Sequence, residues 1–289
     1  FSATQPHLIV DSHVHLFSPE MIRRREQLVA VDPTFAEMYS DPAARMATDD
    51  DLLRDMDEDG VEVSVVLGIG WTDPGLARES NDYIVEVASR NPARIVGFGI
   101  VNPALNGAAE EVERCAGTGL RGIGELHPDT QGFDVADPVV MAPVLDALRA
   151  HDMALTVHCS EPVGHTYPGK GRNTPERLMG LVGMASGLSL VLAHWGGGLP
   201  FYALMPEVAD SLSGVYFDTA ASPFLYDPRV FEVVASLVGS GRIVAASDYP
   251  LMRYTRVRSQ VEATELPEAG RAALLGGNAA RLLGLTSQA

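Results

Sequence analysis

The chain has 289 residues, of which 46% are hydrophobic and 20% are charged, a composition typical of a globular domain rather than a disordered one. Its 38 acidic and 21 basic residues give a formal net charge of −17, and such a surface repels nucleic-acid backbones and anionic membranes. The partner expected from these values is therefore a small-molecule substrate, and neither a nucleic acid nor a membrane.

The cysteines and the lengths of the apolar runs indicate the cellular compartment that we expect for the protein. Cys115 and Cys159 stand far apart and form no CxxC pair, which predicts a reducing, cytoplasmic compartment without disulfides. The longest apolar runs have the length of strands, so we expect no transmembrane helix, and we recognise no signal peptide. Because the chain begins at Phe1 rather than at methionine, the sequence does not tell us where the true N-terminus lies.

Eight short apolar runs rich in Val, Ile and Leu occur along the chain and predict eight β-strands. Several of them are apolar at consecutive positions, as expected of parallel strands that are covered on both faces. The predicted strands span residues 8–11, 62–67, 95–101, 120–124, 154–157, 188–193, 215–218 and 243–246.

Amphipathic segments separate these strands and predict helices. The first long helix has Thr48 as its N-cap, an acidic first turn at residues 49–51 and Gly60 at its end. A last helix over residues 268–283 is interrupted by Gly276 and Gly277. Between them, helices are predicted at residues 76–90, 108–116, 138–151, 175–185, 202–210, 228–238 and 256–265.

Eight strands that are each followed by a helix predict a (β/α)8 TIM barrel, in preference to a doubly wound open sheet. We expect one α/β domain over residues 1–289, since no internal repeat or second domain is visible. Extended loops follow strands 1, 2 and 5, at residues 16–47, 68–75 and 160–174. Loops at the C-terminal ends of strands carry the substrate contacts of barrel enzymes.

Histidines and carboxylates gather where the predicted strands end. His13 and His15 close the first strand and point to the same side, because alternate residues of a strand share a face. Singly, such residues fit structural roles as well, and Asp248 before Tyr249-Pro250 fits a turn. Their repetition at the rim where barrel active sites lie predicts a divalent metal site. The strand-end residues are His13, His15, Glu125, His158, His194 and Asp248, and the ligands predicted are His13, His15, His158 and Asp248.

Several segments resemble the amidohydrolase superfamily across the whole chain. They include Asp11-Ser12-His13-Val14-His15, Thr156-Val157-His158, Ala193-His194-Trp195-Gly196-Gly197-Gly198-Leu199-Pro200, Ala246-Ser247-Asp248-Tyr249-Pro250 and the closing stretch 276–285. The chain is most similar to the amidohydrolase-related branch, which contains aminocarboxymuconate-semialdehyde decarboxylase and several lactonases. The His-X-His match is weak alone, but its combination with the segments around His194 and Asp248 is specific.

The resemblance implies a role for each matching residue. His13, His15 and His158 would be metal ligands, with Asp248 as a fourth ligand or as the base acting on metal-bound water. His194 would activate water or polarise the substrate, and in relatives with two metals it binds the second one. Relatives are often dimers, so a homo-oligomer is expected.

The chain departs from some relatives at the fourth strand, and this departure leaves two possible numbers of metal ions. Some relatives bridge two metals with a carboxylated lysine on the fourth strand, whereas the only lysine here is Lys170, in the loop after the fifth. Glu125 stands where other relatives have a bridging glutamate. We therefore weigh one ion, which we prefer, against two ions bridged by Glu125.

Zinc is the expected metal, with manganese and iron(II) as alternatives, because zinc accepts these ligands and lowers the pKa of bound water to about 7. Asp248 would accept a proton from that water and His194 would assist, so that hydroxide attacks an ester, lactone or amide carbonyl. The main interpretation is thus a metal-dependent hydrolase.

Substrate contacts are expected from the loops. Lys170 and Arg172 fit a substrate carboxylate, and aromatic side chains fit a ring, although solvated charges and capping aromatics explain each residue equally well. His127, two residues beyond Glu125, is the stronger candidate. The predicted substrate contacts are Trp71, Glu125, His127, His165, Tyr167, Lys170, Arg172 and Trp195, with Phe224 and Tyr226 as further pocket residues.

Two other functions compete with hydrolysis. The same site would serve non-oxidative decarboxylation of an aromatic or muconate-type acid, in which protonation of carbon replaces attack on a carbonyl. A non-catalytic metal-binding protein would instead need a closed set of ligands. The number of donors at the predicted rim favours an open, catalytic site.

Overall fold

The computed structural model describes residues 8–285, which form a sheet of eight parallel strands in the order β1 to β8. Backbone hydrogen bonds join the segment directly after β8 to β1, since Ser12 N donates to Ala245 O (2.9 Å) and His15 N donates to Tyr249 O (2.7 Å). The strands are β1 Val10–His15, β2 Val63–Leu67, β3 Ile95–Gly99, β4 Gly122–Leu126, β5 Ala154–Val157, β6 Leu190–Leu192, β7 Val215–Asp218 and β8 Ile243–Val244. The protein is therefore a (β/α)8 TIM barrel, as predicted.

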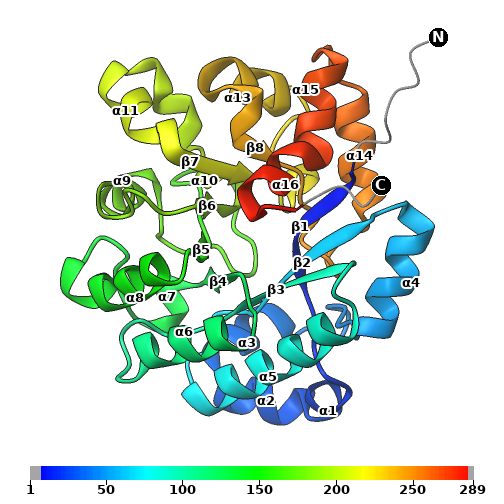
Figure 1. Cartoon of the computed structure of the whole chain (residues 1–289), viewed down its shortest axis with the longest axis vertical. Helices are drawn as coiled ribbons and strands as arrows, with labels where there is room; N and C mark the ends of the chain where they lie inside the picture. The colour runs from blue at the N-terminus through cyan, green and yellow to red at the C-terminus, as the bar shows by residue number, and fades with distance from the viewer. Residues whose placement is uncertain (1–7, 286–289) are drawn as a thin grey trace.

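Helices surround this barrel (Figure 1). The longer ones are α4 Asp49–Asp59, α5 Pro74–Arg90, α6 Ala108–Gly117, α8 Pro138–Ala150, α9 Pro175–Met184, α13 Val230–Val238 and α14 Tyr254–Glu262. Thr48 and Asp51 form a capping box at the start of α4, and Gly60 ends it at a positive φ of 66°. Both ends of α4 are where the sequence predicts them. None of the described helices is long and apolar enough to cross a membrane.

Residues 16–47, expected to be a loop, contain three helices: α1 Pro19–Arg23, α2 Arg25–Val31 and α3 Pro33–Tyr39. Pro19 and Pro33 occupy the first turns of α1 and α3, where a missing N–H costs nothing. Ser18 and Asp32 cap these helices, and Asp32 also accepts hydrogen bonds from the backbone and hydroxyl of Thr72. The segment is thereby tied to the loop after β2.

Other helices are short and lie at the strand ends or near the C-terminus. They are α7 Pro128–Gln131, α10 Ala193–Gly196, α11 Pro206–Ser211, α12 Ser222–Leu225, α15 Glu268–Ala272 and α16 Asn278–Leu283. The helix predicted at 202–210 is split into a 3-10 segment, Leu199–Leu204, and α11. The predicted break at Gly276-Gly277 is a π-helical turn, Ala273–Gly277, which continues into α16.

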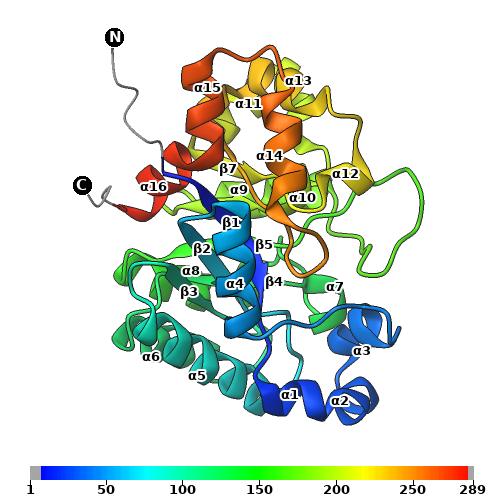
Figure 2. The ribbon, with the colours of Figure 1, turned by 90° about the vertical axis from the view of Figure 1, so that its right-hand side faces the viewer.

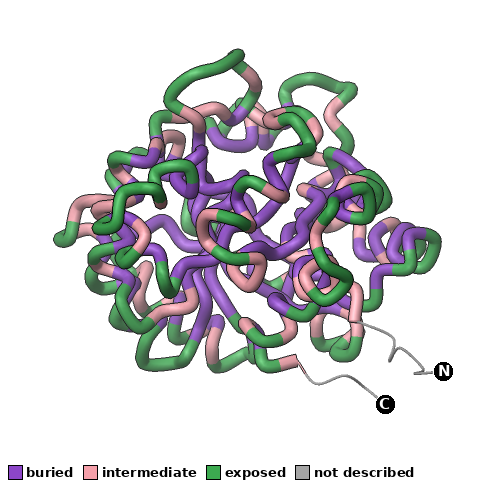
Figure 3. Tube along the Cα trace, turned by 90° about the horizontal axis from the view of Figure 1, so that it is seen from above, coloured by how far each residue is buried: buried purple, intermediate pink, exposed green. Residues whose placement is uncertain are grey.

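Two hydrophobic layers form the core. Alternate residues of β2 and β3, such as Val63, Val65 and Phe98, pack inside the barrel together with Ala279 and Leu283 of α16. The larger cluster lies between the sheet and the surrounding helices. Seen from above, the buried trace occupies the middle of the molecule and the exposed trace its edge (Figure 3).

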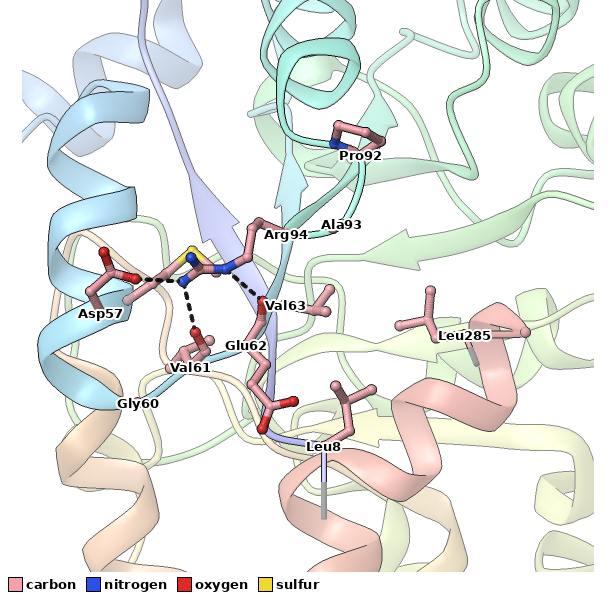
Figure 4. Close-up of a pocket in the computed structure, with 12 residues that line it drawn as sticks. Leu8, Asp57, Gly60, Val61, Glu62, Val63, Pro92, Ala93, Arg94 and Leu285 are labelled. Carbon is pink, nitrogen blue, oxygen red and sulfur yellow. Dashed lines mark hydrogen bonds and ion pairs between the residues drawn. The ribbon is translucent and has the colours of Figure 1, made fainter. Parts of the chain in front are cut away.

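The two ends of the barrel differ. In Figure 2, α16 lies on the left, whereas α3, α7, α12 and the loop after β5 lie on the right, beyond the C-terminal ends of the strands. A depression of about 720 Å³ opens at the α16 end (Figure 4). There Arg94 donates to Asp57 (2.9 Å) and to the carbonyl oxygens of Glu62 (2.9 Å) and Val61 (3.1 Å). These bonds fasten α4 to the beginning of β2 and β3.

Gly276 allows α16 to approach β1, which leads to a stability prediction. A Cβ at Gly276 would lie 1.7 Å from Leu8 O, whereas a Cβ at Gly277 would have no neighbour closer than 3.6 Å. We expect Gly276→Ala to lower the free energy of unfolding by about 1–3 kcal/mol or more, because backbone cannot give way locally. The measurement is urea denaturation followed by circular dichroism.

Gly277→Ala is the matched control. Gly277 has helical torsion angles (φ −58°, ψ −36°), so alanine should leave stability unchanged or raise it by up to about 1 kcal/mol. Equal losses in the two variants would contradict the proposed contact between Gly276 and Leu8.

Candidate metal centre

The C-terminal ends of five strands bring the predicted ligands together. His13 and His15 belong to β1 and Glu125 to β4, while His158 directly follows β5 and His194 lies just beyond the end of β6. Asp248 follows β8, and its backbone N donates to His13 O (3.0 Å). All these side chains are buried, except that of Asp248, which is 17% exposed. The rim predicted from the sequence is thus a compact cluster of nitrogen and oxygen donors.

His13, His15 and Asp248 form a first ligand group. The Nε2 atoms of His13 and His15 are 3.0 Å apart, and Asp248 Oδ1 lies 3.8 Å from the first and 3.5 Å from the second. Ligand atoms bound to one zinc ion at about 2.0–2.2 Å are about 3–3.5 Å from one another. The spacing and chemistry of these donors fit a divalent cation.

Glu125, His158 and His194 form a second ligand group. Glu125 Oε1 lies 3.0 Å from His158 Nδ1 and 3.2 Å from His194 Nε2. The other oxygen of Glu125, Oε2, lies 3.4 Å from His13 Nε2 and 3.7 Å from His15 Nε2. The Glu125 carboxylate therefore faces both groups. His158, predicted to act with His13, His15 and Asp248, lies instead with Glu125 and His194.

Hydrogen bonds at Nδ1 of three imidazoles turn their Nε2 atoms toward the centre. His13 Nδ1 lies 2.8 Å from Asp218 Oδ2, and His15 Nδ1 lies 3.2 Å from Leu67 O. His194 Nδ1 lies 3.0 Å from Ala220 O. Acceptors at Nδ1 fix the tautomer and ring orientation of metal-binding histidines.

Asp218 is a residue of the candidate site that the sequence interpretation missed. Besides contacting His13, it accepts hydrogen bonds at Oδ1 from the backbone N of His194 (2.9 Å) and of Ala220 (3.0 Å). It therefore orients one histidine of each ligand group. Its position at the end of the predicted strand 215–218 was the available signal, because the other rim residues are recognised in the same way.

Two residues of the centre adopt backbone conformations that non-glycine residues rarely use. His194 has a φ of 54° and Asp248 a φ of 66°, both in the left-handed region. Gly197 follows His194 at a φ of 57°, and a Cβ there would lie 2.4 Å from Ser160 O. Such strain persists only where the surrounding structure enforces it, and it commonly marks functional sites.

The histidines and carboxylates of the centre strongly influence one another's pKa values. Burial opposes ionisation of Glu125, but the neighbouring His13 and His158 outweigh it and hold the pKa of this carboxyl well below its usual value. Burial likewise opposes the charged form of His13, yet Glu125 and Asp218 raise its pKa well above the usual value. Against the same burial, Glu125 and Asp248 raise the pKa of His194 to about 9. The carboxylates thus favour positive charge at this position, which a bound cation would supply.

The residues predicted to bind substrate occupy different environments. His127 is buried, and its ring stacks on that of His158 with centroids 4.0 Å apart. Trp71 is fully buried, stacks on Phe35, and has no acceptor for its Nε1 among the described residues. Trp195 is also fully buried and donates to Ser222 Oγ (2.9 Å), a position in the core that lends no support to a substrate contact.

The loop after β5 holds several other candidates. Lys170 Nζ donates to the carbonyl oxygens of Val163 and His165, both at 2.8 Å, so its charge serves the loop itself. Tyr167 donates to Glu161 (2.8 Å), and its ring lies 5.6 Å from that of His165. Of the remaining candidates, Arg172 is exposed beside Asp129, Phe224 is exposed, and Tyr226 lies near Glu161 and packs against Phe201. Their contacts with substrate stay predictions.

A barrel with two groups of metal-ligand side chains at its C-terminal rim defines a metal-dependent TIM-barrel enzyme. The sequence model described as Amidohydrolase (Amidohydro_2) matches residues 10–285, so the chain belongs to the amidohydrolase family. This family assignment confirms the resemblance seen in the sequence.

Curated relatives include two decarboxylases and one lactonase. The chain is 25% identical over 278 residues to a 2-amino-3-carboxymuconate-6-semialdehyde decarboxylase of Dictyostelium discoideum, covering 81% of this chain and 76% of that protein. It is 23% identical over 256 residues to a gamma-resorcylate decarboxylase of a Polaromonas species (72% and 76%). An L-fucono-1,5-lactonase of Burkholderia ambifaria is 26% identical over 196 residues (61% and 62%).

Solved structures share the fold at low sequence identity. The 5-carboxyvanillate decarboxylase of Sphingomonas paucimobilis has a TM-score of 0.78 at 20% identity, covering 97% of this chain and 100% of that one. The enzyme of the same name from Novosphingobium aromaticivorans, with bound manganese, has a TM-score of 0.80 at 17% identity (97% and 98%). A dihydroxybenzoic acid decarboxylase of Polaromonas, also with bound manganese, has a TM-score of 0.76 at 20% identity (96% and 97%).

The role of Asp218 gives a prediction about metal affinity. We expect Asp218→Asn to weaken binding of Zn²⁺ or Mn²⁺ by about 10–100-fold, because His13 and the backbone of His194 lose the carboxylate that orients them. The measurement is competition against a chromophoric chelator. Asp227→Asn, at an exposed carboxylate, is the control and should leave metal affinity unchanged. Wild-type affinity in a folded Asp218→Asn variant would contradict this role.

Proposed function

We propose that this protein is a metal-dependent decarboxylase that releases carbon dioxide from a small aromatic or muconate-type carboxylic acid. The proposal is supported by the similarity to two decarboxylases, which covers 81% and 72% of the chain. It is also supported by the candidate metal centre, in which each ligand group has three residues. Three protein ligands leave positions on a cation for a substrate carboxylate. The comparisons favour this alternative over the hydrolase that was the main interpretation of the sequence.

The proposed cofactor is a pair of divalent cations. His13, His15 and Asp248 would hold one ion, Glu125, His158 and His194 would hold the other, and Glu125 would contact both. This grouping favours two ions over the single ion preferred from the sequence. Imidazole and carboxylate donors accept zinc and manganese alike, and manganese is bound in two decarboxylases of the same fold.

Decarboxylation requires a proton to replace the departing carbon dioxide. The bond between the substrate carbon and its carboxyl group breaks, the electron pair stays on that carbon, and a proton fills the position. When bound, the cations would supply positive charge that anchors the acid and stabilises the electron-rich substrate. Asp248 is the proposed proton carrier, because its side chain is 17% exposed whereas the other ligands are 9% exposed or less.

Hydrolysis of a lactone or ester is the second candidate. The observation that favours it is the position of Glu125 between the two ligand groups, since pairs of bridged metal ions are common in hydrolytic sites. Water would add to the carbonyl carbon, Asp248 would accept its proton, and the carbon–oxygen bond would break. The likeness to a fucono-lactonase is compatible with this reaction.

The number of ions is tested by the metal content of Glu125→Gln. Wild-type protein loaded with Mn²⁺ or Zn²⁺ should contain about two ions per chain, and the variant about one, because the substitution leaves the second group a neutral amide in place of a carboxylate. The measurement is inductively coupled plasma mass spectrometry after removal of free metal. One ion in the wild type and one in the variant would contradict the two-ion centre.

The reaction is tested with two substrate panels. Metal-loaded protein should release carbon dioxide from an acid such as 2,6-dihydroxybenzoate or a muconate analogue. The release is followed by a coupled enzymatic assay for carbon dioxide. Asp248→Asn should reduce kcat by at least about 100-fold with an unchanged circular dichroism spectrum, and a chelator should abolish turnover.

Sugar lactones form the second panel, with acid production as the readout. Lactone opening without carbon dioxide release would transfer the assignment to hydrolysis. Turnover of either kind that persists in Asp248→Asn would remove Asp248 from its proposed role.

A further inference from the structure

His127 lies beside the candidate metal centre without belonging to either ligand group. It follows β4, is only 3% exposed, and its ring stacks on that of His158 with centroids 4.0 Å apart and planes inclined by 21°. Its backbone N donates to Gln131 Oε1 (2.8 Å), and that side chain in turn donates to the carbonyl oxygens of Trp71 and Val101. The loops after β2, β3 and β4 therefore hold His127 in place.

A chain of hydroxyl groups reaches Nδ1 of His127. Thr34 Oγ1 donates to Thr130 Oγ1 (2.6 Å), so the proton of Thr130 is free to donate onward. The nearest acceptor is His127 Nδ1 at 3.1 Å, ahead of the backbone oxygen of His127 at 3.3 Å. We assign the hydrogen bond from Thr130 Oγ1 to Nδ1, and this assignment places the hydrogen of the neutral ring on Nε2.

Nε2 of His127 has no hydrogen-bond partner among residues 8–285, although it is buried. An unpaired buried polar atom is unfavourable, so its retention needs a reason. Nε2 lies beneath the loop after β5, since a Cβ on Gly169 would lie 3.8 Å away. This loop is on the same side of the barrel as α3 and α7, beyond the C-terminal ends of the strands (Figure 2).

We propose that His127 determines specificity by donating its Nε2 hydrogen to an oxygen of the substrate next to the metal-bound carboxylate. The substrate class would be carboxylic acids that have a hydroxyl or carbonyl oxygen near the reacting group. Analogues with a methyl group at that position leave the donor unpaired and are rejected. This inference rests on the proposed decarboxylase function, because it takes the substrate carboxylate to bind at the metal centre.

The test compares hydroxyl and methyl groups of similar size. We would titrate Mn²⁺-loaded protein with 2-hydroxybenzoate and 2-methylbenzoate, and with the corresponding 3-substituted pair, by isothermal calorimetry. The wild type should bind one hydroxy acid about tenfold or more tightly than its methyl partner. In His127→Phe, which retains a ring to stack on His158, that preference should fall to about one, with metal content and circular dichroism unchanged. His127→Gln, which restores an N–H donor, should recover part of the preference.

His151→Phe is the matched control, since His151 is exposed at the end of α8 and should not influence the preference. A preference in His127→Phe equal to that of the wild type would overturn the inference, and so would the absence of any preference in the wild type. Carbon dioxide release measured on the same four acids separates the two proposals. If carbon dioxide is released but His127→Phe keeps the hydroxyl preference, the decarboxylase assignment stands and the inference about His127 fails. If His127 controls the hydroxyl preference but no carbon dioxide is released, only the decarboxylase assignment fails.

Discussion

The structure depends on holding four imidazoles and two carboxylates together at the barrel rim, where each has a neighbouring donor atom at 3.5 Å or closer and all but Asp248 are buried. Such a cluster is unfavourable unless its charges compensate, because each ionised group loses its hydration when it is buried. Glu125 makes the arrangement tolerable, since its two oxygens contact histidines of both groups. The same set of carboxylate oxygens and imidazole nitrogens suits divalent cations, whose charge would replace that of the imidazolium groups.

The barrel supplies the rigidity that this cluster requires. Asp248 and His194 hold left-handed backbone conformations, and Asp248 is fixed by the hydrogen bond from its backbone N to His13 O where β8 meets β1. Asp218 joins β7 to β1 through His13 and to the segment after β6 through His194. The contacts that close the sheet are thus also those that orient the ligands, so fold stability and metal binding share the same residues.

Much of the fold was predictable because its signals are local. Continuous apolar runs marked the parallel strands, and Thr48 and Gly60 marked the ends of α4. The helices within residues 16–47 were missed, since Pro19 and Pro33 indicate a loop as readily as a first helical turn. The interruption expected at Gly276-Gly277 is a π-helical turn rather than a break in the chain direction, and Gly276 lets this turn pack against Leu8.

The sequence by itself determined the barrel, the rim and the identities of the metal-ligand candidates, because strand ends and donor side chains are encoded residue by residue. Only the tertiary structure decided how those donors are grouped. It placed His158 with Glu125 and His194, brought Asp218 behind His13, and left Nε2 of His127 without a hydrogen-bond partner among the described residues. These relations join strands that are distant in sequence, and distances of about 3 Å depend on barrel closure and register, which no local pattern specifies.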